Sequence, residues 1–281
     1  MKKVLFGFFI SIFLLTSSTT TYAAEIQIKV DGVAVASDAK PEVKNKRTMV
    51  PLRVISENLG ASVEWSNSEA ILAKGDMKVT VKLNSSTAEK NGEKIQLDVK
   101  PYIKNNRIFV PLRFIAETFD CHVNYSNRAV TVDTKPLVIN GAQIKALQHE
   151  FHMTMGGVIQ QVNGNAYAEA IYNIFVENKG ENVEAPTSYS WKINIDTPGS
   201  YYKNAQYDFL DLNGNSVARF DIYSLNPFPV ELLKGYPEIL VHDVSNDEWY
   251  LFSETARKSI GQLMDTAAEN GFRTIISNTI V

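Results

Sequence analysis

The chain has 281 residues, of which 44% are hydrophobic and 21% are charged, and its formal net charge at pH 7 is −3. Nucleic acid requires clustered Lys and Arg side chains that displace counterions, so this mildly acidic composition argues against nucleic-acid binding. Cys121 is the only cysteine, which excludes an intramolecular disulfide. The length suits two domains of ordinary size.

Residues 1–23 have the features of a signal peptide. Lys2 and Lys3 precede an apolar run, "VLFGFFISIFLL", which is too short to cross a membrane as a helix, and small residues follow it. We expect cleavage between Ala23 and Ala24. The mature chain is therefore predicted to be secreted, either extracellular or associated with the cell wall, and to have no transmembrane segment.

An internal repeat with a period of sixty residues follows. The stretch "RTMVPLRVISENLG", 47–60, returns as "RIFVPLRFIAETFD", 107–120, and matching positions continue on both sides without a gap. A fixed period of this kind is typical of two copies of one supersecondary unit. We expect the two copies to close a single core, so that neither folds alone. Cys121 aligns with Ala61 of the first copy, which predicts a small buried side chain rather than a reactive thiol.

Each copy is predicted to contain one short helix among antiparallel strands. Pro51 and Pro111 follow an extended segment and suit the first turn of a helix, where the missing N–H would have no partner anyway. Apolar residues four positions apart then fall on one helix face. These residues are Ile55 and Leu59 in the first copy, and Ile115 and Phe119 in the second. "ASVEWS" and "CHVNYS" are predicted strands, and "EAILAK" pairs with "MKVTVKL" in a hairpin.

Two polar pairs recur on these helices. Arg53 and Glu57 stand one helical turn apart, as do Arg113 and Glu117 in the second copy. They fit intrahelical ion pairs worth about 0.3–0.5 kcal/mol each, or a repeated polar contact with a ligand. The ion pair is favoured because the residues that surround these pairs, which are expected to pack the helix, also recur in both copies. All four remain candidate ligand contacts.

The segments "RTMVPLRVISENLGASVEW" and "RIFVPLRFIAETFDCHVNY" resemble the copper amine oxidase N-terminal-like domain, also called the stalk domain. The resemblance covers roughly residues 25–133. It implies a module that recurs in secreted bacterial proteins and lies remote from the catalytic centre in the amine oxidases, so it carries no activity. The chain lacks both the Asn-Tyr-Asp/Glu site and the His-x-His copper pair of those enzymes, which excludes amine oxidation.

The whole chain is therefore predicted to be α+β. A signal peptide, 1–23, precedes a β-rich stalk domain, 24–135, whose two repeats each hold a short helix and antiparallel strands. A smaller α+β domain of unknown function, 136–281, follows, with an antiparallel sheet packed on a C-terminal helix.

Within the C-terminal domain, "YSWKINI" fits a strand, and two hairpins are predicted. "AQYDFLDL" and "SVARFDIYS" flank an Asn-Gly turn, and "EILVHDV" and "EWYLFS" flank "SND". Ser253 caps an amphipathic helix, "ETARKSIGQLMDTAAEN", and "FRTIISNTIV" closes the domain as a strand. Residues 166–178 fit either a strand through "IYNIFV" or a helix, and we favour the strand.

The stretch "HEFHMTM", 149–155, is a candidate copper site. His149, His152 and Met153 are donors that copper accepts, and they share one face on a helix. On a strand, by contrast, His152 points away from His149. The alternation is more typical of a strand whose Phe151, Met153 and Met155 face the core, so we expect no metal site and no cofactor.

This expectation predicts that calorimetry finds no stoichiometric submicromolar binding of Cu(I) or Cu(II). Changing His149 and His152 to Ala should leave the thermal stability in excess copper unaltered. A one-to-one complex lost in that double variant would instead identify a copper-handling protein.

Motifs for a catalytic nucleophile, a zinc protease or a phosphate loop do not occur in the sequence. "DLNGN" lacks the later Gly and Glu of a calcium loop.

Trp249 and Tyr250 are candidate ligand contacts, because Trp and Tyr combine an apolar face with a polar handle that suits sugars or peptides.

We therefore predict a non-catalytic exported protein in which the stalk domain presents a ligand-binding domain. A cell-wall glycan or an envelope protein is the expected partner. Two alternatives stay open: an extracellular hydrolase with its acids in the C-terminal domain, and a copper-handling protein that uses His149, His152 and Met153.

Overall fold

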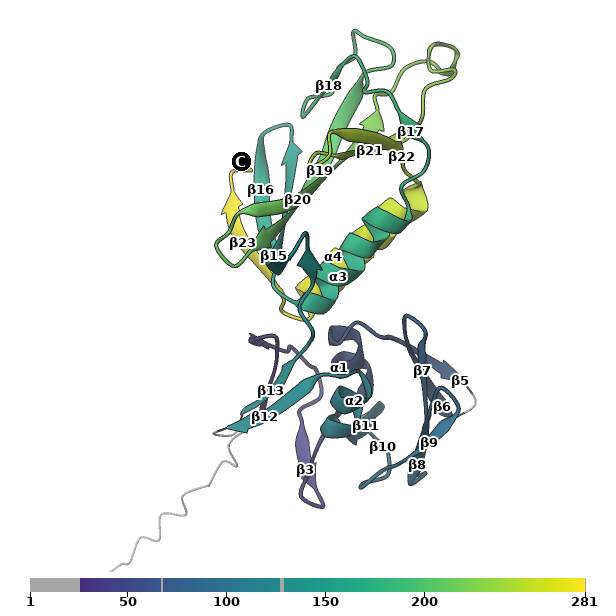
Figure 1. Ribbon diagram of the computed structural model, residues 1–281, viewed down its shortest axis with the longest axis vertical. Helices are drawn as coiled ribbons and strands as arrows, with labels where there is room; N and C mark the ends of the chain where they lie inside the picture. Colours follow the sequence, from purple (N-terminus) through teal and green to yellow (C-terminus); the bar gives the residue numbers. More distant parts are fainter. Residues whose placement is uncertain (1–25, 67, 127–128, 281) are drawn as a thin grey trace, which may run out of the picture.

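The computed structural model describes residues 26–66, 68–126 and 129–280, which form two parts stacked end to end (Figure 1). The predicted signal peptide lies outside the described residues. Every helix among these residues is too short or too polar to span a membrane. Strands make up 47% and helices 18% of the structure, so the predicted α+β class is confirmed.

The N-terminal part contains the two repeats as successive sets of strands with one helix each. The first repeat comprises β1 (Gln27–Val30), β2 (Val33–Ala34), β3 (Glu42–Lys44), β4 (Arg47–Pro51), α1 (Leu52–Asn58), β5 (Ser62–Ser66) and β6 (Glu69–Lys74), and β7 (Met77–Lys82) follows it. The second repeat comprises β8 (Thr87–Lys90), β9 (Glu93–Gln96), β10 (Tyr102–Lys104), β11 (Arg107–Pro111), α2 (Leu112–Thr118), β12 (His122–Ser126) and β13 (Ala129–Asp133).

An approximate two-fold axis relates the repeats. Equivalent strands β4 and β11 pair antiparallel at the centre of a four-stranded sheet with the order β10-β11-β4-β3. Val50 lies opposite Val110, its own counterpart sixty residues later. The axis therefore passes through this residue pair.

Each repeat also completes a sheet of the other. β1 of the first repeat pairs in parallel with β13 of the second over four residue pairs, and β8 and β9 extend the sheet formed by β5, β6 and β7. Ion pairs also join the two repeats reciprocally. Arg47 Nε of the first repeat donates to Asp98 of the second at 2.6 Å, and the equivalent Arg107 donates to the equivalent Asp38. These pairs are exposed, where solvent screens ion pairs and leaves them little net stabilisation, so strand pairing and the shared core hold the repeats together.

The short helices form as the sequence predicts, with one difference at their start. Pro51 and Pro111 keep extended backbones (ψ 119° and 122°) and stand directly before α1 and α2 rather than inside their first turns. The predicted apolar residues of both helices are buried. Gly60 adopts a left-handed conformation (φ +84°) that ends the first helix. Cys121 is buried as predicted, and burial raises the pKa of its thiol to about 11.

The C-terminal part is built on one ten-stranded sheet, with the main strand order β17-β22-β21-β20-β19-β15-β16-β23. Its strands are β14 (Val138–Ile139), β15 (Ala142–Met153), β16 (Gly156–Val162), β17 (Asn182–Val183), β18 (Tyr189–Ser190), β19 (Tyr201–Asp211), β20 (Ser216–Leu225), β21 (Ile239–Asp243), β22 (Glu248–Leu251) and β23 (Arg273–Asn278), and its helices are α3 (Asn165–Glu177), the 3₁₀ turn η1 (Val230–Leu232) and α4 (Glu254–Glu269). Helices α3 and α4 lie side by side against one face of the sheet (Figure 1).

Several predictions for this part are confirmed, including both hairpins and α4, whose N-terminus is capped by Ser253 Oγ accepting from the N–H of Ala256 at 3.0 Å. The domain is larger than the stalk domain, however, and two helices pack on its sheet instead of one. The additional helix is α3, which spans the segment for which a strand was favoured.

The preference for a strand over residues 166–178 is wrong, because this segment forms α3. Tyr167, Ile171 and Phe175 recur at four-residue spacing and are all buried. Phe175 stacks on Phe220 of the sheet with ring centroids 4.6 Å apart. Packing of this stripe outweighs the strand propensity of "IYNIFV".

The strand predicted for "YSWKINI" is also largely wrong, since only Tyr189 and Ser190 pair with the sheet, as β18. Asn194 Oδ1 accepts hydrogen bonds from the backbone N–H groups of Asp196 (2.9 Å) and Thr197 (3.2 Å). Local side-chain bonds of this type compete with strand pairing. The segment therefore forms a loop that lies beside the sheet.

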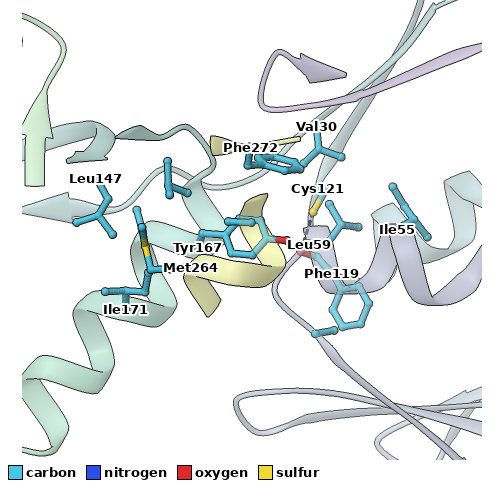
Figure 2. Packing of buried hydrophobic residues seen from close by; sticks show 14 of the residues in the cluster. Val30, Ile55, Leu59, Phe119, Cys121, Leu147, Tyr167, Ile171, Met264 and Phe272 are labelled. Carbon is cyan, nitrogen blue, oxygen red and sulfur yellow. Dashed lines mark hydrogen bonds between the residues drawn. The ribbon is translucent and has the colours of Figure 1, made fainter. Parts of the chain in front are cut away.

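One hydrophobic core runs through both parts of the molecule. Figure 2 shows Tyr167 and Phe272 of the C-terminal domain beside Leu59 and Cys121 of the stalk domain. The hydroxyl of Tyr167 donates to Asn58 Oδ1 at 2.7 Å, which joins α3 to the end of α1. The two domains therefore share a hydrophobic, hydrogen-bonded junction.

A carboxylate from the stalk domain reinforces this junction. Asp31, in the turn after β1, accepts from the backbone N–H of Thr134 at 2.8 Å and from the N–H of Asn165 at 3.0 Å. Asn165 is the first residue of α3. A negative charge is stabilising at a helix N-terminus. Asp31 therefore caps a helix of the other domain, and it also binds Thr134 in the segment that links the two domains.

Candidate functional site

The sheet of the C-terminal domain has a second face that the helices do not cover. Phe220 and Ile222 of β20 belong to the core beneath α3, so Asp221 between them points to the opposite face. A pocket of about 320 Å³ lies on this opposite face, closed on one side by the loop that carries β18. We call it the open-face pocket; it is lined by Tyr189, Ser190, Trp191, Lys203, Arg219, Asp221, Tyr223, His242 and Val244.

A buried carboxylate organises the charges of this pocket. Asp221 Oδ2 lies 2.6 Å from Lys203 Nζ and 2.9 Å from Arg219 Nη2, and Asp221 Oδ1 accepts from Arg219 Nε at 3.0 Å. The side chains of Asp221 and Lys203 are 3% and 6% exposed, whereas that of Arg219 is 33% exposed. Only the guanidinium therefore reaches solvent.

Desolvation lowers the pKa of Lys203, and the bond to Asp221 opposes that shift. The ammonium also donates to Gln206 Oε1 at 2.9 Å and lies 4.5 Å from the ring centroid of Trp191. Its position is thus fixed from three sides.

Aromatic rings form the other walls. Trp191 stacks on His152 with centroids 4.2 Å apart, and Tyr223 and Trp249 lie 4.9 Å apart at the base. Tyr189 stands edge-on to both of these rings at the outer rim and is exposed. The pocket therefore combines an anchored cationic group with an apolar, aromatic wall.

The candidate contacts predicted from the stalk repeat lie elsewhere. Arg53 and Glu57 form the expected ion pair at 3.3 Å and line a groove of about 850 Å³ together with the exposed Trp65. Arg113 and Glu117 stand 3.8 Å apart on α2. Among the described residues, no hydrogen bond or ion pair joins the two pairs.

Trp249 and Tyr250 do not share a site. Trp249 is buried behind the open-face pocket and stacks on His242 at 4.3 Å. Tyr250 packs on the other side of β22, where Lys179 Nζ lies 4.7 Å from its ring and its hydroxyl donates to Glu248 at 2.6 Å. Of the candidates named from sequence, only Trp249 adjoins the pocket.

The stretch "HEFHMTM" ends β15, and its two histidines are separated. His149 stacks on Tyr207 beneath the helices and is hydrogen-bonded to Gln160 at 2.8 Å, whereas His152 stacks on Trp191 and contacts Glu150 at 2.7 Å. Burial lowers the pKa of His149 to about 4, and Arg273 adds to the effect. No group of three His, Cys, Asp or Glu side chains that could hold a metal occurs within the described residues.

The expectation that Met153 and Met155 face the core is wrong. Both are exposed, at 59% and 64%, because β15 ends at Met153 and the chain turns directly into β16. Phe151 remains partly buried on the strand.

Carboxyl groups of the kind a hydrolase needs would carry raised pKa values. Where the described carboxyl groups have a resolved shift, their pKa is lowered, chiefly by ion pairs and hydrogen bonds; these groups are Asp38, Glu42, Asp211 and Glu254. Asp211 accepts from the N–H groups of Asn213 and Asn215, which makes "DLNGN" a hairpin turn.

Comparison with known proteins finds a family match for the first domain. Residues 29–134 match the family described as the copper amine oxidase N-terminal domain, and no family matches the C-terminal region. A curated protein named "Protease inhibitor" from Brevibacillus choshinensis is 25% identical over 150 residues, which is 53% of this chain and 46% of that protein. The match thus spans about half the length of the relative. No solved structure is similar.

Proposed function

We propose, from the premise that residues 29–134 form a copper amine oxidase N-terminal domain, that the protein is an exported, non-catalytic binding protein. The stalk domain holds the C-terminal domain in a fixed orientation, and the open-face pocket binds cell-wall glycan. The observation that carries the proposal is the pocket itself, in which aromatic rings surround a guanidinium held by a buried carboxylate.

The junction supports the role given to the stalk domain. Domains joined by small polar interfaces move relative to one another, whereas here one core is continuous across the boundary. The Asp31 cap and the Tyr167–Asn58 hydrogen bond add directional contacts. A rigid support of this kind keeps the pocket at a constant distance from the stalk domain.

The pocket contacts support binding rather than catalysis. Ser190 is the hydroxyl in the lining that could act as a nucleophile, but its Oγ donates to the carbonyl of Lys192 at 2.9 Å. His242 Nε2 lies 3.0 Å from Asp247. An activated nucleophile requires a hydrogen bond to its base, and these two side chains are engaged elsewhere. The curated relative is also named for an inhibitory function, not a catalytic one.

Glycan is the favoured ligand because the half-buried Trp191 and the exposed Tyr189 border the pocket, and Trp and Tyr side chains suit sugar rings. Purified peptidoglycan sacculi should therefore co-sediment with the mature protein, residues 24–281. Changing Trp191 to Ala should lower the bound fraction at least about fivefold, since one stacking contact is worth about 1 kcal/mol or more.

Trp65→Ala is the matched control, because Trp65 is an exposed aromatic in the stalk groove. Unchanged binding is expected for it. If Trp65→Ala removes binding and Trp191→Ala does not, the site belongs to the stalk domain. If the unaltered protein stays in the supernatant, the proposal fails.

A further inference from the structure

The open-face pocket has one unused hydrogen-bonding edge. Asp221 engages Nε and Nη2 of Arg219, and Nη1 has no hydrogen-bond partner among the described residues. Lys203, by contrast, is bonded to Asp221 and Gln206 and covered by Trp191. The guanidinium is therefore oriented from behind and presents its remaining donors to the pocket, the arrangement that favours charge-assisted recognition of an anion.

The charge of the lining favours a singly charged anion. Lys203 and Arg219 carry two positive charges and Asp221 carries one negative charge, which leaves one positive charge. Two further carboxylates lie just outside the lining: Asp208 accepts from the neutral hydroxyl of Ser216 at 2.7 Å, and Glu150 contacts His152. Their negative charges act on Arg219 and Lys203, so the surroundings favour an anion of low charge, such as a carboxylate, over a doubly charged phosphate.

The aromatic wall and the volume define the rest of the ligand. About 320 Å³ is at the lower end of small-molecule sites and accommodates one sugar ring or one or two amino-acid residues. Trp191 and Tyr189 border this space next to Arg219. A ring or apolar group can therefore contact the wall while its carboxylate reaches the guanidinium.

We propose that the open-face pocket recognises its ligand through a carboxylate bound by Arg219, with the body of the ligand against Trp191 and Tyr189. This inference rests on the proposed function and narrows it to the acidic groups of the cell wall. Such a carboxylate can belong to a peptide terminus or to the lactyl group of an amino sugar.

Calorimetry with matched probes tests the inference on the mature protein. The peptide arm compares N-acetyl-Phe-Ala with its C-terminal amide, and the sugar arm compares N-acetylmuramic acid with N-acetylglucosamine, which lacks the carboxylate. In at least one arm the acid should bind about tenfold or more tightly than its neutral partner, since a charge-assisted bond contributes about 1.5–3 kcal/mol. The arm that responds identifies the source of the carboxylate.

Arg219→Gln should abolish the preference for the acid, and Arg219→Lys should retain part of it and keep a cation beside Asp221. Arg257→Gln is the control, because Arg257 pairs with Glu254 on α4, away from the pocket. Thermal melting confirms that each variant is folded. Equal binding of acid and neutral probes in both arms, or a preference that survives Arg219→Gln, overturns the inference.

Co-sedimentation with sacculi separates the two proposals. If sacculus binding depends on Trp191 but calorimetry shows no preference for the acidic probes, the proposed glycan-binding function stands and the inference of carboxylate recognition fails. Acid-selective binding without co-sedimentation retains the carboxylate and removes the glycan role.

Discussion

A fragment that ends after the first repeat, residues 24–84, is expected to remain unfolded. Without the second repeat, β1 loses β13, β4 loses β11 and β7 loses β8, so each of its three sheets loses a hydrogen-bonded neighbour. α1 has only seven residues, too few to be stable without tertiary packing. The fragment should show no cooperative thermal transition and no dispersion of its amide proton signals.

The chain from residue 24 to residue 281 is the reference for this experiment and should melt cooperatively under the same conditions. A sharp transition of the fragment with well-dispersed amide signals would show that one repeat suffices. In that case the reciprocal strand exchange would be a consequence of folding rather than a requirement for it.

Tyr167→Ala is expected to destabilise the protein by about 3–5 kcal/mol, as large-to-small substitutions of buried aromatic residues do. The ring lies 5.2 Å from that of Phe272, and its hydroxyl bonds both Asn58 and Asn270. Because the cavity opens at the domain junction, unfolding should split into two transitions. Differential scanning calorimetry measures both effects.

Tyr167→Phe is the matched control, since it keeps the ring and removes only the hydroxyl. We expect a loss of about 1–3 kcal/mol, because Asn58 Oδ1 is left without its donor in a buried site, and a single transition. A single transition for Tyr167→Ala with less than about 1 kcal/mol lost would mean that the junction does not couple the domains.

The stalk domain could be predicted closely from the sequence because the repeat doubles every signal. Ile55 and Ile115 mark the same helix face twice, and Pro51 and Pro111 mark the same strand-to-helix boundary. What the repeat could not supply was the exchange of strands between copies. Pairing of β1 with β13 joins residues about a hundred positions apart, and no local pattern encodes such a contact.

The C-terminal domain was less predictable because its decisive contacts are long-range. α3 was missed since "IYNIFV" satisfies strand propensity, while the buried stripe of Tyr167, Ile171 and Phe175 acquires meaning only against the sheet. The open-face pocket was missed for a related reason. Charged residues within apolar strands, Lys203 and Asp221, were the available signal, but their pairing across β19 and β20 depends on a register shift after Lys203.

The parallel pairing of β1 with β13 has a mechanical consequence. The chain enters the stalk domain at the start of β1 and leaves it at the end of β13, so these two strands run side by side with the points of entry and exit at opposite ends. A pull between the N-terminal end and the C-terminal domain is directed along both strands. The hydrogen bonds between them are then strained simultaneously in shear, instead of opening one after another from an end. Under such a pull the stalk domain resists tension along the chain and transmits it to the C-terminal domain.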